Sequence, residues 1–206
     1  MKYTLLAFAT LFYMSVLGQN SYTSKKDISD IKEIIFYGYD FSNFKLADGK
    51  RFSDEKIKKY IPAWISFLTG KMNETYFAKR LKTNKVIFDF EFTTKLIKEL
   101  DEQTLVSLIK NHINIDSLQG IINNYETTRK EGIGFSIIVE CFDKSTNRSS
   151  AYFTFFDIAT KKIIMTDYFS TNHASGAGLS KYWGRGFYIT VDSYISDEFK
   201  SSLRKK

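Results

Sequence analysis

The chain has 206 residues, a formal net charge of +7, 43% hydrophobic and 26% charged residues. This composition is that of a folded globular protein, and it excludes the disordered, collagen-like and membrane-embedded classes. One cysteine excludes an internal disulfide and a thiolate metal cluster, and two histidines leave little for a histidine-rich metal site. We therefore predict no metal and no cofactor. The 17% of aromatic residues can build a large core without disulfides.

The first 18 residues have the pattern of a secretory signal peptide. Lys2 supplies a positive charge, residues 5–17 are mostly apolar, and Gly18 provides a small residue for cleavage. The alternative interpretation is a transmembrane anchor. An anchor needs ~20 apolar residues, and this run has about 13, so it is too short. We expect cleavage before Gln19, with no cysteine there for lipidation. The mature chain would then begin with a flexible leader at 19–30. We predict that it has no transmembrane segment and that it is periplasmic or secreted.

The first part of the mature chain predicts a strand followed by helices. Residues 34–41 form a continuous apolar run inside 31–44, which is typical of a strand covered on both faces. Ser53, Asp54 and Glu55 then resemble a helix start, with a capping hydroxyl before two acids. Apolar residues follow at helical spacing: Ile57, Tyr60, Ile61, Trp64, Ile65 and Leu68. Pro62 predicts a kink inside that helix.

The middle of the chain predicts further short elements. Residues 76–81 suggest a second short helix. The alternation of residues 85–92 predicts a strand, with three phenylalanines on one face and Ile87, Asp89 and Glu91 on the other. Two short helices are expected at 104–110 and 117–125, with Asp101 and Asp116 as candidate caps.

The last third of the chain predicts a meander and a final helix. Three strands are expected at 135–142, 151–158 and 162–169, and their short connections imply antiparallel neighbours. A long amphipathic helix is expected over 179–203. Gly184 and Gly186 near its start weaken it by ~1 kcal/mol each relative to alanine, or allow close backbone packing.

These elements give the order β-α-β-α-α-β-β-β-α. We predict a single domain over 31–206, of the α/β (α+β) class. It would contain a mixed sheet, an antiparallel three-strand meander and a long C-terminal helix. The β-α-β opening predicts a parallel crossover that feeds the sheet.

Two carboxylates are the first candidate site. Asp89 and Glu91 stand two residues apart on the predicted strand, so both would lie on one face. Such a pair can act as general acid and base or hold a metal. The alternative interpretation is a solvated strand face, since alternating charges are typical of half-exposed strands.

The segment 171–186 is the second candidate site, and the best place to look for a ligand. It carries His173 and the glycines Gly176 and Gly178 just before the final helix, and the cations Lys181 and Arg185 near the start of that helix. Glycines before a helix start let backbone N–H groups bind an anion. The spacing matches neither a phosphate-binding loop nor a dinucleotide fingerprint. The alternative is a flexible connection without a ligand.

The basic charge predicts an acidic partner or a solvated basic surface. Lysines are spread along the chain, and no basic and aromatic motif of an RNA-binding sheet is present, so we expect no nucleic acid. For an exported chain, an anionic envelope component such as lipid, lipopolysaccharide or acidic glycan is the expected class.

Three segments carry a resemblance to known proteins: Tyr37-Gly-Tyr-Asp-Phe-Ser42, the meander motif at 156–163, and the entry to the last helix at 176–183. They resemble a group of exported proteins of unknown function from Bacteroidota-type bacteria. More distantly, the element order is similar to envelope domains of the curli-secretion lipoprotein, Tol-Pal amino-terminal and penicillin-binding-protein-activator kind. In those domains the meander turn often has Gly where this chain has Lys161, and the amino terminus is often lipidated.

That resemblance implies adaptor work between envelope proteins rather than catalysis. The first hypothesis is therefore a non-enzymatic interaction module with an exposed apolar patch or sheet edge. The second is a small-ligand or glycan-binding protein that uses 171–186. The third is a hydrolase that uses Asp89, Glu91 and His173, which requires those side chains to meet in one cleft.

Overall fold

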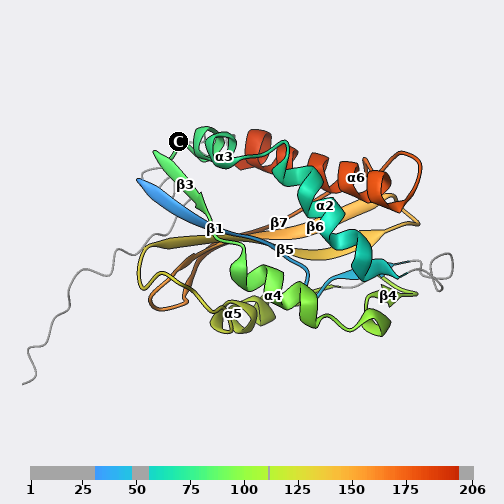
Figure 1. Cartoon of the computed structure of the whole chain (residues 1–206), viewed down its shortest axis with the longest axis horizontal. Coiled ribbons are helices and arrows are strands. Elements are labelled where there is room, and N and C mark those ends of the chain that lie inside the picture. Colours follow the sequence, from blue (N-terminus) through green and yellow to red (C-terminus); the bar gives the residue numbers. More distant parts are fainter. Residues whose placement is uncertain (1–30, 48–55, 111, 200–206) are drawn as a thin grey trace, which may run out of the picture.

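The computed structural model describes residues 31–47, 56–110 and 112–199. They form a seven-stranded mixed sheet with helices on both faces, which confirms the α/β class (Figure 1). The predicted signal peptide and leader (1–30) and the predicted helix start at 53–55 lie outside the described residues.

The centre of the sheet is β5 (Ile133–Asp143), all eleven residues of which are buried. β1 (Glu33–Asp40) and β2 (Lys45–Ala47) both pair with β5 in parallel, one after the other along the same side. β3 (Lys85–Phe88) pairs in parallel with β1, and β4 (Val106–Ser107) with β2. The predicted parallel pair of the β-α-β opening is therefore β1 and β3. The β2–β4 pair extends the sheet beyond the predicted strands.

The antiparallel part of the sheet is the predicted meander. β5 pairs with β6 (Arg148–Asp157), and β6 pairs with β7 (Ile163–Thr171). The turn between β6 and β7 is held by Asp157, whose Oδ1 accepts hydrogen bonds from the backbone and hydroxyl of Thr160. Lys161 follows with φ of 60°, the left-handed conformation that favours glycine.

One face of the sheet is covered by α2 (Ile61–Thr69), α3 (Glu74–Leu81) and α6 (Leu179–Ser193), as Figure 1 shows. α6 continues into a π-helical turn at Tyr194–Glu198. The predicted end of this helix at 203 lies outside the described residues. The core on this face is largely aromatic, and its largest fully buried side chains include Trp64, Trp183, Tyr39, Tyr194, Phe36, Phe77 and Phe142.

The kink predicted at Pro62 is wrong. The chain forms a 3₁₀ turn at Ile57–Tyr60 and then starts α2, so Pro62 stands in the first turn of that helix. A first-turn residue has no intrahelical partner for its N–H, and the fixed φ of proline suits that position. The proline therefore helps to start the helix instead of bending it.

The other face of the sheet is covered by α4 (Glu91–Glu99) and α5 (Ile115–Asn123) (Figure 1). Their buried residues pack with side chains from β1, β5 and β6: Phe92, Leu118 and Ile122 meet Ile35, Tyr37, Ile138, Tyr152 and Phe156. β1 contributes side chains to the cores on both faces, as its continuous apolar run predicted.

The strand predicted over 85–92 is wrong in its second half. β3 ends at Phe88, and α4 begins at Glu91. The rings of Phe88 and Phe90 stack with centroids 4.9 Å apart, on the same core as Phe36. Phe92 instead belongs to the core on the opposite face. The alternating phenylalanines thus fill both cores, because a strand ends and a helix begins between them. Their alternation alone is typical of a single strand, and this is why one strand was predicted.

The helix predicted over 104–110 is also wrong. Residues 102–104 form a 3₁₀ turn capped by Asp101, and β4 follows. The backbone N–H of Leu46 donates to the carbonyl oxygen of Leu105 at 2.7 Å, so pairing with β2 decides the conformation. The next predicted helix is α5, and its cap is Asn114, two residues before Asp116.

Candidate functional site

The segment 171–186 joins β7 to α6 on the surface. The side chains or backbones of the five predicted ligand residues are exposed: His173, Gly176, Gly178, Lys181 and Arg185. Gly178 is the N-cap of α6, with φ of 77° and no side-chain cap. His173, Gly176 and Gly178 lie on the connection, whereas Lys181 and Arg185 lie in the first turns of α6. Exposure and a helix start alone do not specify a ligand.

The same segment is anchored by contacts to the turn before β6. The backbone N–H of Ala174 donates to the carbonyl of Asn147 at 3.2 Å, and the Tyr182 hydroxyl donates to the Asn147 side chain. The ammonium of Lys144 lies 3.7 Å from the centre of the Tyr182 ring. A Cβ on Gly186 would lie 2.8 Å from that of Ala174, so this glycine permits the close packing that was one expectation.

The two predicted carboxylates do not share a strand face. Asp89 follows β3 and accepts a hydrogen bond from the Thr128 hydroxyl at 2.7 Å, whereas Glu91 is exposed in the first turn of α4. β3 and β7 are at opposite edges of the sheet, with β1, β5 and β6 between them. At ~4.8 Å per strand they are ~19 Å apart. The structure therefore does not bring Asp89 to His173, which follows β7.

A different carboxylate, Glu140, is fully buried in the middle of β5. Its Oε2 accepts from the Ser150 hydroxyl at 2.8 Å, and its Oε1 accepts from the backbone N–H of Ile113 at 3.1 Å. The Nδ1 atom of His112 lies 3.4 Å from Oε1. The register of β5 and β6 shifts between Val139 and Cys141, so Glu140 is the extra residue of a bulge. Bulges redirect side chains and are frequent beside functional sites.

This arrangement holds one surface segment onto the sheet. The buried carboxylate bonds the backbone at Ile113, and the Tyr152 hydroxyl donates to the carbonyl of the same residue at 2.9 Å. The His112 side chain is 68% exposed, so one nitrogen faces the carboxylate while the ring remains accessible to solvent. We name Glu140, Tyr152 and Ile113 the clamp. Its sequence signal is an acid inside the apolar run of β5, which sequence reasoning missed.

Four large apolar side chains among the described residues are exposed. Leu108 and Ile109, 70% and 76% exposed, follow β4 at the edge of the sheet opposite β7. Ile115, 59% exposed, lies two residues after the clamped Ile113, and Tyr168, 42% exposed on β7, has its ring 5.1 Å from that of Tyr152 in the clamp. We name Ile115 and Tyr168 the apolar surface. Exposed apolar groups of this kind are typical of interaction sites.

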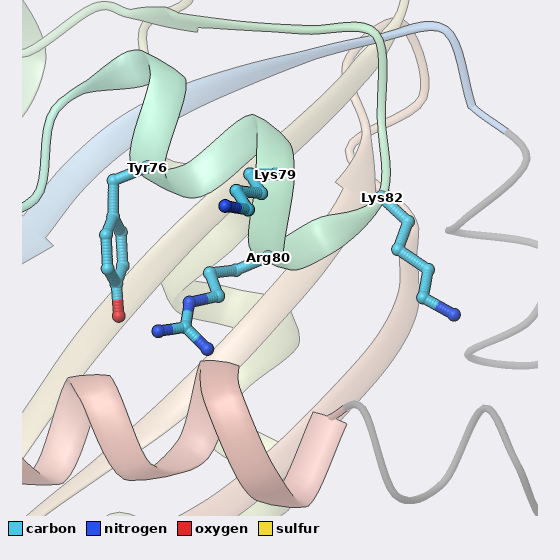
Figure 2. A pocket seen from close by; sticks show the side chains of 4 residues that line it. All are labelled: Tyr76, Lys79, Arg80 and Lys82. Carbon is cyan, nitrogen blue, oxygen red and sulfur yellow. The ribbon is translucent and has the colours of Figure 1, made fainter.

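A pocket of about 310 Å³ lies on the other face of the sheet, beside α3. The described residues that line it are Tyr76, Lys79, Arg80 and Lys82. Figure 2 shows Tyr76 and Arg80 directed from α3 toward the C-terminal part of α6, with Lys82 at the end of α3. The Tyr76 hydroxyl donates to the carboxylate of Asp192. This pocket was not predicted, because its lysines and arginine are no more densely clustered in the sequence than the other basic residues of the chain.

Comparison with protein-family models, with curated proteins and with solved structures finds no match for this chain. Within the described residues, no helix is long and apolar enough to cross a membrane. In the same part of the chain, no group of three or more His, Cys, Asp or Glu side chains is placed to hold a metal ion.

Proposed function

We propose that this protein is an exported, non-enzymatic interaction module of the cell envelope, and that it binds a partner protein at the free edge of β7. One observation carries the proposal. Among the described strands β7 pairs only with β6, and its side chains are partly exposed along its whole length, whereas those of β6 are nearly all buried. An unpaired edge offers a row of N–H and C=O groups to an added strand.

The residues of β7 support this use of the edge. Natural proteins protect open edges with lysine, proline or short strands. β7 has nine residues and contains no lysine, proline or glycine. Its one charged residue, Asp167, accepts a hydrogen bond from the Tyr194 hydroxyl at 2.6 Å and so faces the core. The edge therefore lacks lysine and proline, although β7 carries a bulge at Ile164 and the inward-pointing charge of Asp167.

The apolar surface gives the partner strand something to pack on. Tyr168 lies on β7 itself, and the Tyr152 ring connects it to the clamped segment with Ile115. A strand added to β7 would place every second side chain toward this face of the sheet. The partner we propose is a protein segment in extended conformation with apolar residues at alternate positions.

A pull-down from solubilised envelope tests the proposal. The bait proteins are the wild type, Tyr168→Lys, Ile115→Ser and the control Ser175→Lys, which adds the same charge at an exposed position of the 171–186 segment. We expect one protein retained at high salt by the wild type and the control, and lost with the first two variants. A protein that is retained at low salt but lost at high salt would contradict the proposal. Such binding depends on exposed charges, which salt screens.

Sedimentation of the purified protein separates a partner protein from self-pairing. If β7 instead pairs with a second copy, a dimer forms without any partner, and Tyr168→Lys dissociates it. A monomer at all concentrations, together with the retained protein above, is the result we expect.

A further inference from the structure

The pocket beside α3 concentrates positive charge. Lys79, Arg80 and Lys82 are the three charged residues among the described side chains that line it. Other cations of the described chain form ion pairs, such as Lys85 with Glu33 at 3.2 Å and Lys95 with Glu126 at 3.0 Å. No such pair within the described part of the chain involves the three cations of the pocket. Their charge is thus available to a ligand.

The Arg80 guanidinium is held in position before any ligand arrives. It lies 5.3 Å from the centre of the Tyr76 ring, a distance suited to a cation–π contact. Tyr76 is fixed in turn, because its hydroxyl bonds Asp192, and Ser196 donates to the same carboxylate oxygen at 3.1 Å. Asp192 is a nearby acid, and both hydroxyls donate to its Oδ1. A preorganised guanidinium binds oxyanions well, because little side-chain entropy is lost.

Lys82 adds an independent observation. It is the residue after α3 and has φ of 57°, the left-handed conformation in which helices usually place glycine or asparagine. The helix dipole favours cations in the last turn, which accounts for Lys79 and Arg80 there. Lys82 ends the helix as a left-handed cap, with its N–H bonded to the carbonyl of Ala78, at a cost of ~1 kcal/mol for a side chain. Asn147 and Lys161 adopt the same conformation in turns, so the relevant feature of Lys82 is that its side chain lines the pocket beside Lys79 and Arg80.

We infer that the pocket binds the phosphate group of a small phosphate ester, a site separate from the proposed β7 edge. Arg80 would bind two oxygens through its fork of donors, while Lys79 and Lys82 supply point charges. The volume of about 310 Å³ is at the lower end of small-ligand pockets, so it suits a phosphate with a body the size of one sugar. The phosphate can belong to a free metabolite or to a lipid headgroup.

Calorimetric titration with glucose 6-phosphate tests the site, with glucose as the uncharged probe. The variants are Arg80→Gln and the control Arg129→Gln, which removes the same charge from an exposed position between α5 and β5. We expect Arg80→Gln to weaken binding by about tenfold or more, the cost of one charged hydrogen-bond pair, and Arg129→Gln to leave it unchanged. Equal losses in both variants, or no binding to the wild type, would overturn the proposal.

The variant Lys82→Gly distinguishes a lysine that binds phosphate from a lysine that only ends α3. Glycine relieves the left-handed backbone, so the variant should melt at a higher temperature than the wild type and yet bind glucose 6-phosphate more weakly. A lower melting temperature with unchanged affinity would show that Lys82 serves the fold, and would remove it from the site.

Vesicle sedimentation distinguishes the two sources of phosphate. Phosphatidylcholine vesicles with and without phosphatidic acid present the same phosphate monoester on a membrane. Binding that Arg80→Gln abolishes identifies a lipid headgroup as the ligand, and binding of glucose 6-phosphate alone identifies a soluble one. Loss of β7-edge binding in the pull-down would leave both results unaffected, so the two proposals fail separately.

Discussion

Gly186 and Gly184 lie two residues apart on α6 and yet meet different surroundings. A Cβ on Gly186 would lie 2.8 Å from the Cβ and 2.9 Å from the Cα of Ala174. A Cβ on Gly184 would meet Phe67 and Trp64 at 3.6 Å, an ordinary contact. From the sequence, both glycines are expected to lower helix stability equally relative to alanine. Only the packing around them in the folded protein shows that they differ.

We therefore predict opposite effects for alanine at these two positions. Gly186→Ala should lower the free energy of unfolding by about 1–3 kcal/mol, because the backbone of Ala174 must move. Gly184→Ala should be neutral or raise it by up to about 1 kcal/mol through helix propensity. Urea unfolding of both variants checks this. A destabilised Gly184→Ala would show that the contact with Phe67 and Trp64 is tighter than 3.6 Å implies.

Buried tyrosine hydroxyls also differ from one residue to the next. The Tyr39 side chain is 1% exposed, and its hydroxyl has no hydrogen-bond partner among the residues that the structure describes. The Tyr125 hydroxyl lies 2.8 Å from both Asp40 Oδ2 and Ser136 Oγ, and it is the donor to that buried carboxylate. An unsatisfied buried hydroxyl costs free energy, whereas a satisfied one stabilises its partners.

Phenylalanine at these tyrosines should have opposite effects. Tyr39→Phe removes an unpaired polar group, and we expect the free energy of unfolding to rise by about 1 kcal/mol. Tyr125→Phe leaves Asp40 with one bond fewer inside the protein, and we expect a loss of about 1–3 kcal/mol. Thermal unfolding at neutral pH compares the two. A loss in Tyr39→Phe would mean that its hydroxyl has a partner in solution.

At the scale of elements, the clamp decides where one surface segment lies. Glu140 bonds the backbone of Ile113, and Tyr152 bonds the carbonyl of the same residue. Ile113 also packs in the core beneath α5, whereas Ile115 is exposed. Hydrogen bonds to β5 and β6, together with burial of Ile113, therefore position the part of the apolar surface that Ile115 contributes.

Removing the carboxylate should release this segment. Glu140→Ala leaves the Ile113 N–H and the Ser150 hydroxyl without their buried acceptor, and we expect a loss of about 2–3 kcal/mol. Hydrogen exchange should accelerate at 106–115 more than at the centre of β1, because the opening is local. Glu140→Gln keeps one acceptor oxygen and should have an intermediate effect. Unchanged exchange at 106–115 in Glu140→Ala would show that the clamp does not hold the segment.

At the scale of the whole molecule, the aromatic core predicts a loss of stability in alkali. Burial, with Asp89 nearby, raises the pKa of Tyr37 to about 12, and burial with the Asp192 hydrogen bond raises that of Tyr76 to about 12. Burial also raises the pKa values of Tyr39, Tyr125 and Tyr194. In the folded protein each of these tyrosines keeps its proton above pH 10, where the same tyrosine in the unfolded chain has already lost it.

Stability should therefore be constant with respect to these groups below pH 10 and fall between pH 10 and 12. Each buried tyrosine contributes a slope of about 1.4 kcal/mol per pH unit in that interval. Urea unfolding at a series of pH values measures the slope. Tyr37→Phe should make it shallower by one such contribution, and an unchanged slope in that variant would contradict the assignment.

Within the described residues, the sequence by itself determined the elements whose residues agree with one pattern. The continuous apolar run of β1 predicts a buried strand because both of its faces are covered. α3, α5 and α6 follow from helical spacing, and the meander from its short turns. The α/β class and the parallel pairing of β1 with β3 follow from the element order. These predictions needed only local periodicity.

Tertiary structure decided the rest, because distant backbone pairing and packing override local periodicity. The helical spacing of 104–110 gives way to the β4 pairing with β2, and the alternation of 85–92 is divided between two cores. The same is true of the sites. The exposed segment 171–186 could be located from its glycines. The clamp at Glu140, the free edge of β7 and the cation pocket beside α3 bring together residues from different elements, so their geometry exists only once the sheet is assembled.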